Sequence, residues 1–358
     1  MTNVNTNKKR SAMAMDFAAF IIIIAGIMYA ASFVTSLLMA FFISIIFAQP
    51  IQWLKRKKVP QGLAITIVFI LIVSLFFGFG EIIAASFSSF SQDVPRYAKN
   101  LNEMRDSLLQ FMENRGMHVS TVEMKNMFNP SKVISFTSVL LGQLGGLMGN
   151  AFTIFFLALF LLLEIDSIKV KANAIMKENT GTLAYFNVIG ASIRHYLTIK
   201  TLTSLLTGFF VWICLIIIGV DYAIIWALIA FLLNYIPNIG SIIAAVPAIL
   251  FALIQLGFGG VIWTTATFVA VNMIIGNMVE PKMMGEGMGL STFVVFLSLL
   301  FWGFILGTVG MFLSVPLTMA MKIMLEQNPN TKWIAIVLGT QGEAQDIIDD
   351  DKTGIDNS

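Results

Sequence analysis

Residues 222–256 read YAIIWALIAFLLNYIPNIGSIIAAVPAILFALIQL, two apolar runs on either side of a polar break at 234–240. As a helix, each run of about 15 residues rises about 22 Å, less than the roughly 30 Å of a bilayer's hydrocarbon core. Pro237 cannot donate a backbone hydrogen bond and disfavours helix at the residue before it, and Gly240 tolerates a positive φ. The sequence therefore predicts a helix that is interrupted at membrane depth.

Such a break is tolerated in the hydrocarbon region only where protein or a water-filled cavity satisfies the backbone polar groups. Interrupted apolar segments are also typical of transporter binding sites. We interpret 222–256 as a re-entrant hairpin whose tip lines a translocation pathway; the alternative is two short spans joined by a turn. The tip supplies the candidate pathway residues Asn234, Tyr235, Pro237, Asn238 and Gly240.

The composition places the whole chain in the membrane. Of its 358 residues, 57% are hydrophobic and 12% are charged, and soluble chains carry about twice that charged fraction. Continuous apolar runs of 18 residues or more indicate a polytopic all-α membrane protein and exclude a β-barrel, whose strands alternate. We expect about six full spans plus two re-entrant hairpins, or 8–10 helices if the hairpins span.

Cofactors, enzymatic chemistry and nucleic acid are not expected. Cys214 is the only cysteine, and the two histidines lack ligand spacing. The sequence contains no Walker motif, nucleophile–base set or zinc motif. The net charge of +2 does not indicate nucleic acid, because the basic residues lie beside spans and orient the chain. Membrane lipid is an expected partner of the spans.

The N-terminal region, 1–87, is predicted to hold three spans, at 17–34, 35–54 and 61–87. Basic residues at 8–10 and the cluster Lys55 to Lys58 place the N-terminus in the cytoplasm by the positive-inside rule. An amphipathic segment outside the cytoplasm follows at 88–146. Within it we expect a helix that starts at Pro95, covers 97–115 and stops at Gly116.

Residues 147–200 are predicted to form a span and then a cytoplasmic elbow helix with an apolar stripe. The transport core, 201–327, begins with a span at 201–219 and the hairpin. Gly257 to Gly260 then turns the chain into a span at 261–279. The tail, 328–358, is polar and cytoplasmic, with a frayed acidic end at Asp349 to Asp351.

A second interrupted run lies at 290–325, with its break at Gly307 to Gly310 and with Pro316 in its second half. If each hairpin follows one full span, the first hairpin enters from outside and the second from the cytoplasm. That arrangement is an inverted repeat with tips near the midplane. Four full crossings by the short runs would leave every loop on the same side as this arrangement does, so mapping the loops does not distinguish the two.

Two acids in the core are candidates for chemistry, because charge within the hydrocarbon costs several kcal/mol. Asp221 is expected to cap the helix that follows it. Glu280 comes just after Asn272 and Asn277, and it could bind a cation or a proton, or form an ion pair with Lys282. We count both asparagines with the pathway. The coupling or gating set is Glu280, Pro281, Gly307, Gly310 and Pro316.

Several stretches of the C-terminal half resemble the autoinducer-2 exporter family of bacterial membrane proteins. They are His195-Tyr196-Leu197 with Lys200-Thr201, Asn234 to Ser241, Gly276-Asn277-Met278-Val279-Glu280-Pro281, Gly287 to Ser291, Phe301-Trp302-Gly303 and Leu313 to Thr318. The resemblance covers most of the chain and is most specific from about 190 to 327.

The resemblance implies a multipass inner-membrane protein that exports the quorum-sensing signal autoinducer-2 and assembles as a homo-oligomer, a pentamer. It also implies that 234–240, with Asn277, Glu280 and Pro281, corresponds to the family's signature regions. Relatives in the same broad family resemble sodium/proton antiporters, so the family alone does not fix the substrate.

Three functions remain open from the sequence. Export of autoinducer-2 or a similar small polar metabolite fits a pathway rich in amides and poor in charge. A sodium/proton antiporter would need a titratable site in the membrane, at Glu280. A scaffold without transport activity would use 88–146 to bind a partner, and the broken spans argue against it.

Overall fold

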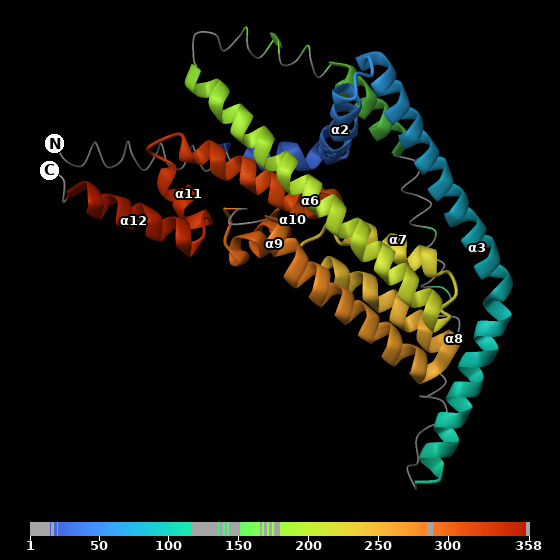
Figure 1. Cartoon of the computed structure of the whole chain (residues 1–358). Helices are drawn as coiled ribbons and strands as arrows, with labels where there is room; N and C mark the ends of the chain where they lie inside the picture. Colours follow the sequence, from blue (N-terminus) through green and yellow to red (C-terminus); the bar gives the residue numbers. More distant parts are fainter. Residues whose placement is uncertain are drawn as a thin grey trace. The chain divides into compact units, whose positions relative to one another are not determined.

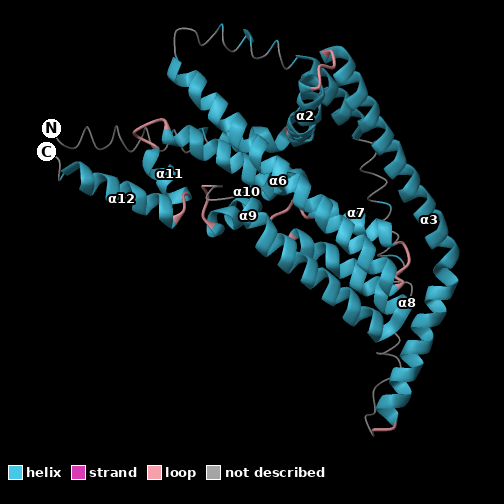
Figure 2. Ribbon diagram, in the orientation of Figure 1, coloured by secondary structure: helices cyan, strands magenta, loops and turns pink. Residues whose placement is uncertain are grey.

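The computed structural model describes residues 21–115, 151–164, 180–284 and 289–355, and a few single residues outside these ranges. Every regular element in these ranges is a helix (Figure 2). Five helices are long and apolar enough to cross a membrane, and Ala151–Glu164 and Ala223–Leu233 are shorter apolar helices. The prediction of an all-α polytopic membrane protein is confirmed.

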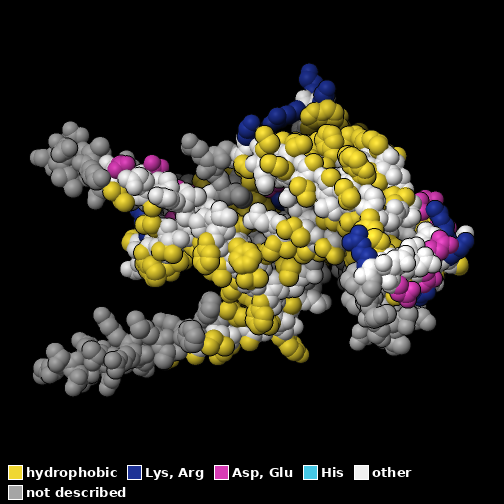
Figure 3. Space-filling view, turned by 90° about the horizontal axis from the view of Figure 1, so that it is seen from below, with side chains coloured by type: hydrophobic (Ala, Val, Ile, Leu, Met, Phe, Trp, Pro, Cys, Tyr) yellow, Lys and Arg dark blue, Asp and Glu magenta, His cyan; other side chains and the backbone are white. Residues whose placement is uncertain are grey.

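The elements follow one another in chain order (Figure 1). They are α2 (Ala31–Arg56), α3 (Gln61–Glu113), α6 (Thr180–Ile218), α7 (Ala223–Leu233), α8 (Gly240–Val271), the π-helix η1 (Asn272–Val279), α9 (Glu280–Met284), α10 (Thr292–Glu326), α11 (Lys332–Leu338) and α12 (Gln341–Ile355). Hydrophobic side chains cover much of the face in Figure 3, as expected for helices that contact lipid.

The chain divides into two compact units, each considered by itself. One comprises Met1–Ile45, Thr153–Ile193 and Met288–Ser358, and the other comprises Ile46–Phe152 and Arg194–Gly287. The second unit contains α3, most of α6, α7, α8, η1 and α9. The break at 234–240 belongs to this unit.

The predicted chain reversal between residues 34 and 35 is wrong, because α2 begins at Ala31 and runs through that point. Residues 21–29 are also helical, and Val34 N donates to Ala30 O at 3.0 Å. Thr35 Oγ1 donates to Ala31 O at 2.7 Å. Because this hydroxyl bonds the preceding turn of its own helix, Thr35 is accommodated inside α2 and no loop is needed here.

The helix start predicted at Pro95 is also wrong, since Pro95 lies inside the 53-residue helix α3. A proline removes one hydrogen bond of the helix, but packing on both sides of it keeps α3 continuous. Phe90, Tyr97 and Leu101 are buried to 2%, 1% and 3% exposure in the core that α7 and α8 form. The helix ends at Glu113, and Gly116, the predicted stop, lies outside the described residues.

The predicted elbow helix is not a separate element, because α6 continues without interruption from Thr180 to Ile218. It ends where predicted, at Gly219, whose φ of 85° is in the left-handed region.

The break of the first hairpin is confirmed. α7 ends at Leu233, α8 begins at Gly240, and the two helices pack against each other. Asn238 takes a left-handed φ of 60° between them. A Cβ on Gly240 would lie 1.8 Å from Leu233 O, so only glycine allows α8 to start this close to the end of α7. Whether the hairpin is re-entrant stays a prediction.

Two tight turns interrupt the long helices α8 and α10. Gly257 has φ 69° and ψ −155°, and Gly307 has φ 64° and ψ −148°. Three residues after each of them, a second glycine lies against the helix segment that precedes the turn. A Cβ on Gly260 would lie 2.8 Å from Ala252 O, and a Cβ on Gly310 would lie 1.9 Å from Trp302 O. The break predicted at 307–310 is confirmed.

These two Gly-x-x-Gly turns have the same backbone geometry at an offset of 50 residues. The turn at 234–239 is different, because it has six residues and its left-handed residue is Asn238. The turn at Gly307 contains no residue that corresponds to Asn238. The local likeness therefore pairs the Gly257 and Gly307 turns. The inverted repeat, which pairs the 234–240 break with the Gly307 break, stays a prediction.

The polar tail is folded into α11 and α12, and α11 packs against α10. Glu343 accepts a hydrogen bond from the buried Lys322 at 2.6 Å, and Ser291 N donates to Leu338 O at 3.2 Å. The frayed acidic end is wrong, because α12 runs to Ile355. Gln345 Nε2 donates to Asp349 Oδ1 at 3.2 Å, one turn further along α12, and a pair of this kind supports the helix through these acids.

Candidate functional site

A stripe of polar residues follows one face of α6. Lys200, Thr203, Ser204 and Thr207 are spaced for one helix face, and each is at most 4% exposed. Polar side chains in an apolar span need internal partners. Thr207 Oγ1 finds one in its own helix, donating to Thr203 O at 2.9 Å. The side chains of the other three contact residues outside α6.

The break after α7 places two predicted pathway residues against α6, one on this stripe and one beside it at Thr201. Asn234, 6% exposed, donates from Nδ2 to Ser204 Oγ at 3.0 Å. Tyr235 donates from its hydroxyl to Thr201 Oγ1 at 2.9 Å. The irregular backbone thus delivers an amide and a phenol to a helix face that already carries hydroxyls.

Glu280 closes the other side of the stripe with an ion pair. Lys200 Nζ lies 2.6 Å from Glu280 Oε1, and the two side chains are 5% and 14% exposed. Thr203 Oγ1 lies 3.1 Å from Glu280 Oε2. The predicted partner Lys282 is wrong: it is exposed, and Lys200, distant in sequence, takes its place.

The π-helix η1 comes immediately before Glu280. An i→i+5 turn changes the direction of the side chains that follow, and such segments occur often at functional sites. Asn272 begins η1, and its Oδ1 lies 2.9 Å from where a Cβ on Gly276 would be. Pro281 follows η1 with no break in the helix, so the hydrogen bond that it cannot donate is missing from a continuous helical stretch.

The structure therefore brings Asn234, Tyr235 and Glu280 together on α6. Asn238 and Asn277 are exposed, and Asn238 serves the turn through its φ of 60°. The other predicted residues do not contact the stripe through any described hydrogen bond or ion pair. Pro237 and Gly240 shape the break, Asn272 lies in η1, and Gly307, Gly310 and Pro316 lie in α10, in the other compact unit.

Lys200, Thr203 and Ser204 were missed as site residues. Lys200 looked like a marker of the cytoplasmic end of a span. A signal was available, because the spacing 200, 203, 204 and 207 puts four polar residues on one face of an apolar helix.

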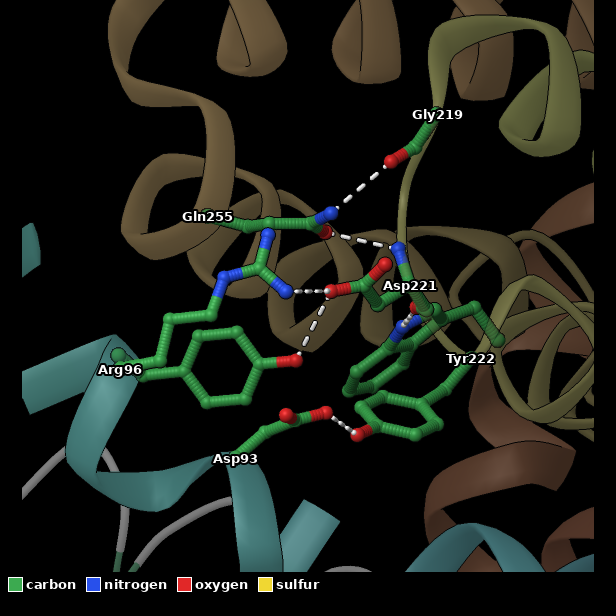
Figure 4. Close-up of polar contacts among 8 residues, drawn as sticks. Asp93, Arg96, Gly219, Asp221, Tyr222 and Gln255 are labelled. Atoms are coloured by element: carbon green, nitrogen blue, oxygen red, sulfur yellow. Dashed lines mark hydrogen bonds and ion pairs between the residues drawn. The ribbon is translucent and has the colours of Figure 1, made fainter. Parts of the chain in front are cut away.

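A second polar cluster joins α3 to the α6–α7 connection (Figure 4). Tyr97 donates to Asp221 Oδ2 at 3.0 Å, and Arg96 Nη1 lies 3.7 Å from the same oxygen. Asp221 was expected to cap α7, which is wrong: the N-cap is Tyr222, and no side chain caps this helix. Gln255 accepts from Asp221 N at 2.7 Å and donates to Gly219 O at 2.9 Å.

Tyr222 extends this cluster by donating to Asp93 Oδ2 at 2.6 Å. Burial, and then the bond to Asp93, raises the pKa of Tyr222 to about 12. The cluster fixes α3 to the end of α7 that lies opposite the break. We regard it as structural support for the hairpin.

The sequence matches known proteins over almost its whole length. The profile described as AI-2E family transporter matches residues 17–330. The chain belongs to the AI-2E transporter family.

Among the similar members of this family, the AI-2 transport protein TqsA of Escherichia coli K12 is 36% identical over 318 residues, 89% of this chain and 92% of TqsA. A provisionally named transport protein of Haemophilus influenzae is 42% identical over 341 residues, 94% of this chain and 97% of its own. YhhT of Escherichia coli K12, also named provisionally as a transport protein, is 38% identical over 325 residues, 91% of this chain and 93% of its own. Membership in this transporter family, together with the apolar helices, makes the chain a multipass membrane protein.

Proposed function

We propose that this AI-2E family transporter exports a small, uncharged, polar solute, with autoinducer-2 as the first candidate. The observation that carries the proposal is the character of the α6 site: buried hydroxyls and an amide surround two charges, Lys200 and Glu280, that cancel at 2.6 Å. The name of TqsA supports autoinducer-2 as the candidate solute.

The site can bind a polyhydroxylated solute by exchanging hydrogen bonds. The pairs Asn234–Ser204 and Tyr235–Thr201 each join a donor to a hydroxyl. A solute hydroxyl that donates to one member and accepts from the other replaces such a pair at little net cost. The solute would therefore move Asn234 and Tyr235 away from α6, and it would take over the hydrogen bonds of both side chains and of the α6 hydroxyls.

Sodium/proton antiport is the alternative function, and the buried carboxylate of Glu280 is the observation in its favour. An antiporter needs that carboxylate to exchange a cation and a proton. Its occupation by Lys200 and Thr203 favours the uncharged solute instead.

The resemblance to the family extends the proposal to location and assembly. We propose a bacterial inner-membrane protein with cytoplasmic N- and C-termini that forms a homo-oligomer, a pentamer. The basic cluster between α2 and α3 supports a cytoplasmic position for that loop.

The test is autoinducer-2 efflux from proteoliposomes that contain the wild type or Asn234→Leu. The variant removes the donor to Ser204, so we expect efflux to fall at least about tenfold, the equivalent of roughly 1.4 kcal/mol. The matched control is Asn238→Gly, which keeps a left-handed turn residue at an exposed position and should transport normally. Equal efflux from Asn234→Leu and the wild type would contradict the proposal.

A further inference from the structure

The carboxylate of Glu280 has a partner at each oxygen. Lys200 Nζ is 2.6 Å from Oε1, and the Thr203 hydroxyl is 3.1 Å from Oε2. The same hydroxyl lies 3.2 Å from the Lys200 backbone oxygen. The ammonium of Lys200 therefore lies on one oxygen of a buried carboxylate, and a carboxylate oxygen is also a ligand that a hard metal cation prefers.

The charge of this site depends on one lysine. Lys282, on the same element as Glu280, is exposed. Tyr196 of α6 is 4% exposed, and a tyrosine hydroxyl carries no positive charge that could neutralise a carboxylate. Tyr235, from the break, is directed to Thr201. Among the described residues, Lys200 is therefore the cation that pairs with Glu280.

We propose that Lys200 determines the ion specificity of the transporter by acting as a tethered counter-cation. Its ammonium occupies the position that Na⁺ would take at Glu280, and so the wild type carries its solute without binding a coupling ion. Without the lysine, the buried carboxylate binds Na⁺, since an uncompensated charge at that depth is strongly unfavourable. The inference deepens the proposed function, because it concerns the same site.

The test reads Na⁺ binding directly and requires no transported solute, so its failure is distinguishable from failure of the proposed function. Purified full-length protein is heated in NaCl or in choline chloride of equal ionic strength, at several pH values from 6 to 9. We expect no Na⁺-specific shift of the midpoint for the wild type. For Lys200→Gln we expect a rise of roughly 2–4 °C at Na⁺ tenfold above its Kd.

Two further variants identify the site. Lys200→Arg keeps a cation beside Glu280 and should not respond to Na⁺. The double variant Lys200→Gln/Glu280→Gln removes the carboxylate and should lose the response of the single variant.

A folded Lys200→Gln with no Na⁺-specific shift across this pH range would overturn the proposal. A Na⁺ shift in the wild type that disappears in Glu280→Gln would also overturn it. If Lys200→Gln fails to fold in choline, purification in NaCl should recover it at several times the yield. Equal recovery in the two salts would again overturn the proposal.

Discussion

The ion pair between Lys200 and Glu280 makes a quantitative prediction about stability. Its side chains are 5% and 14% exposed, so solvent screens the pair little. Lys200→Met leaves a buried carboxylate and Glu280→Gln leaves a buried ammonium, and breaking a buried pair in this way costs about 3–5 kcal/mol. The double variant Lys200→Met/Glu280→Gln leaves neither charge, and it should lose clearly less than the sum of the two single losses.

The assay is thermal unfolding of the four proteins in detergent, with choline chloride in place of NaCl so that no Na⁺ can bind to an unpaired carboxylate. Each single variant should unfold roughly 6–15 °C below the wild type, and the double variant should lie close to the wild type. Single losses below about 1 kcal/mol would show that the pair is solvated and not buried. Additive losses would show that the two charges do not interact, and either result would refute the reasoning.

Three further variants test other parts of the structure. Gly310→Ala places a Cβ 1.9 Å from a backbone oxygen and should unfold the α10 turn, with a loss of unfolding free energy above about 3 kcal/mol. The control is Gly259→Ala, whose Cβ meets nothing within 4 Å and which should be neutral or stabilising. Both are measured by urea or thermal unfolding. Tyr97→Phe removes a hydrogen bond to a carboxylate and should cost about 1.5–3 kcal/mol by the same measurement, with an unchanged midpoint as the contradicting result. Glu343→Gln weakens the pair with the buried Lys322 and should cost about 1 kcal/mol, less in high salt, since Glu343 is 44% exposed; a loss independent of salt would contradict an ionic role.

The sequence predicted the features that depend on local backbone chemistry. Pro237 and Gly240 marked the break after α7, and Gly307 and Gly310 marked the turn in α10. In each case a residue with an unusual backbone preference stands in an otherwise apolar run, so no tertiary information was needed.

The failures share a different cause, which is a partner distant in sequence. Pro95 did not start a helix, because α3 packs along the core of α7 and α8 on both sides of it. Asp221 did not cap α7, because Tyr97 binds its carboxylate across 124 residues. Lys200 was not recognised as a buried site residue, because Glu280 pairs with it across 80 residues. Local propensity could not reveal these pairings.

The site was predicted in part for the same reason. Asn234, Tyr235 and Glu280 were recognised because polar groups in apolar segments are costly wherever they lie. The surface of α6 that receives them was not recognised. Hydroxyl side chains are common in membrane helices. Thr203 and Ser204 differ from the others only in their contacts with Glu280 and Asn234, which the sequence does not reveal.

The most direct test of the account is autoinducer-2 flux in proteoliposomes of the purified wild type, with and without an imposed proton gradient, together with proton movement in response to Na⁺ in the same vesicles. An uncharged solute at an electrically neutral site predicts autoinducer-2 flux above that of empty vesicles and no proton movement in response to Na⁺. Absence of flux together with Na⁺-dependent proton movement would contradict the account and make Glu280 the centre of an antiporter.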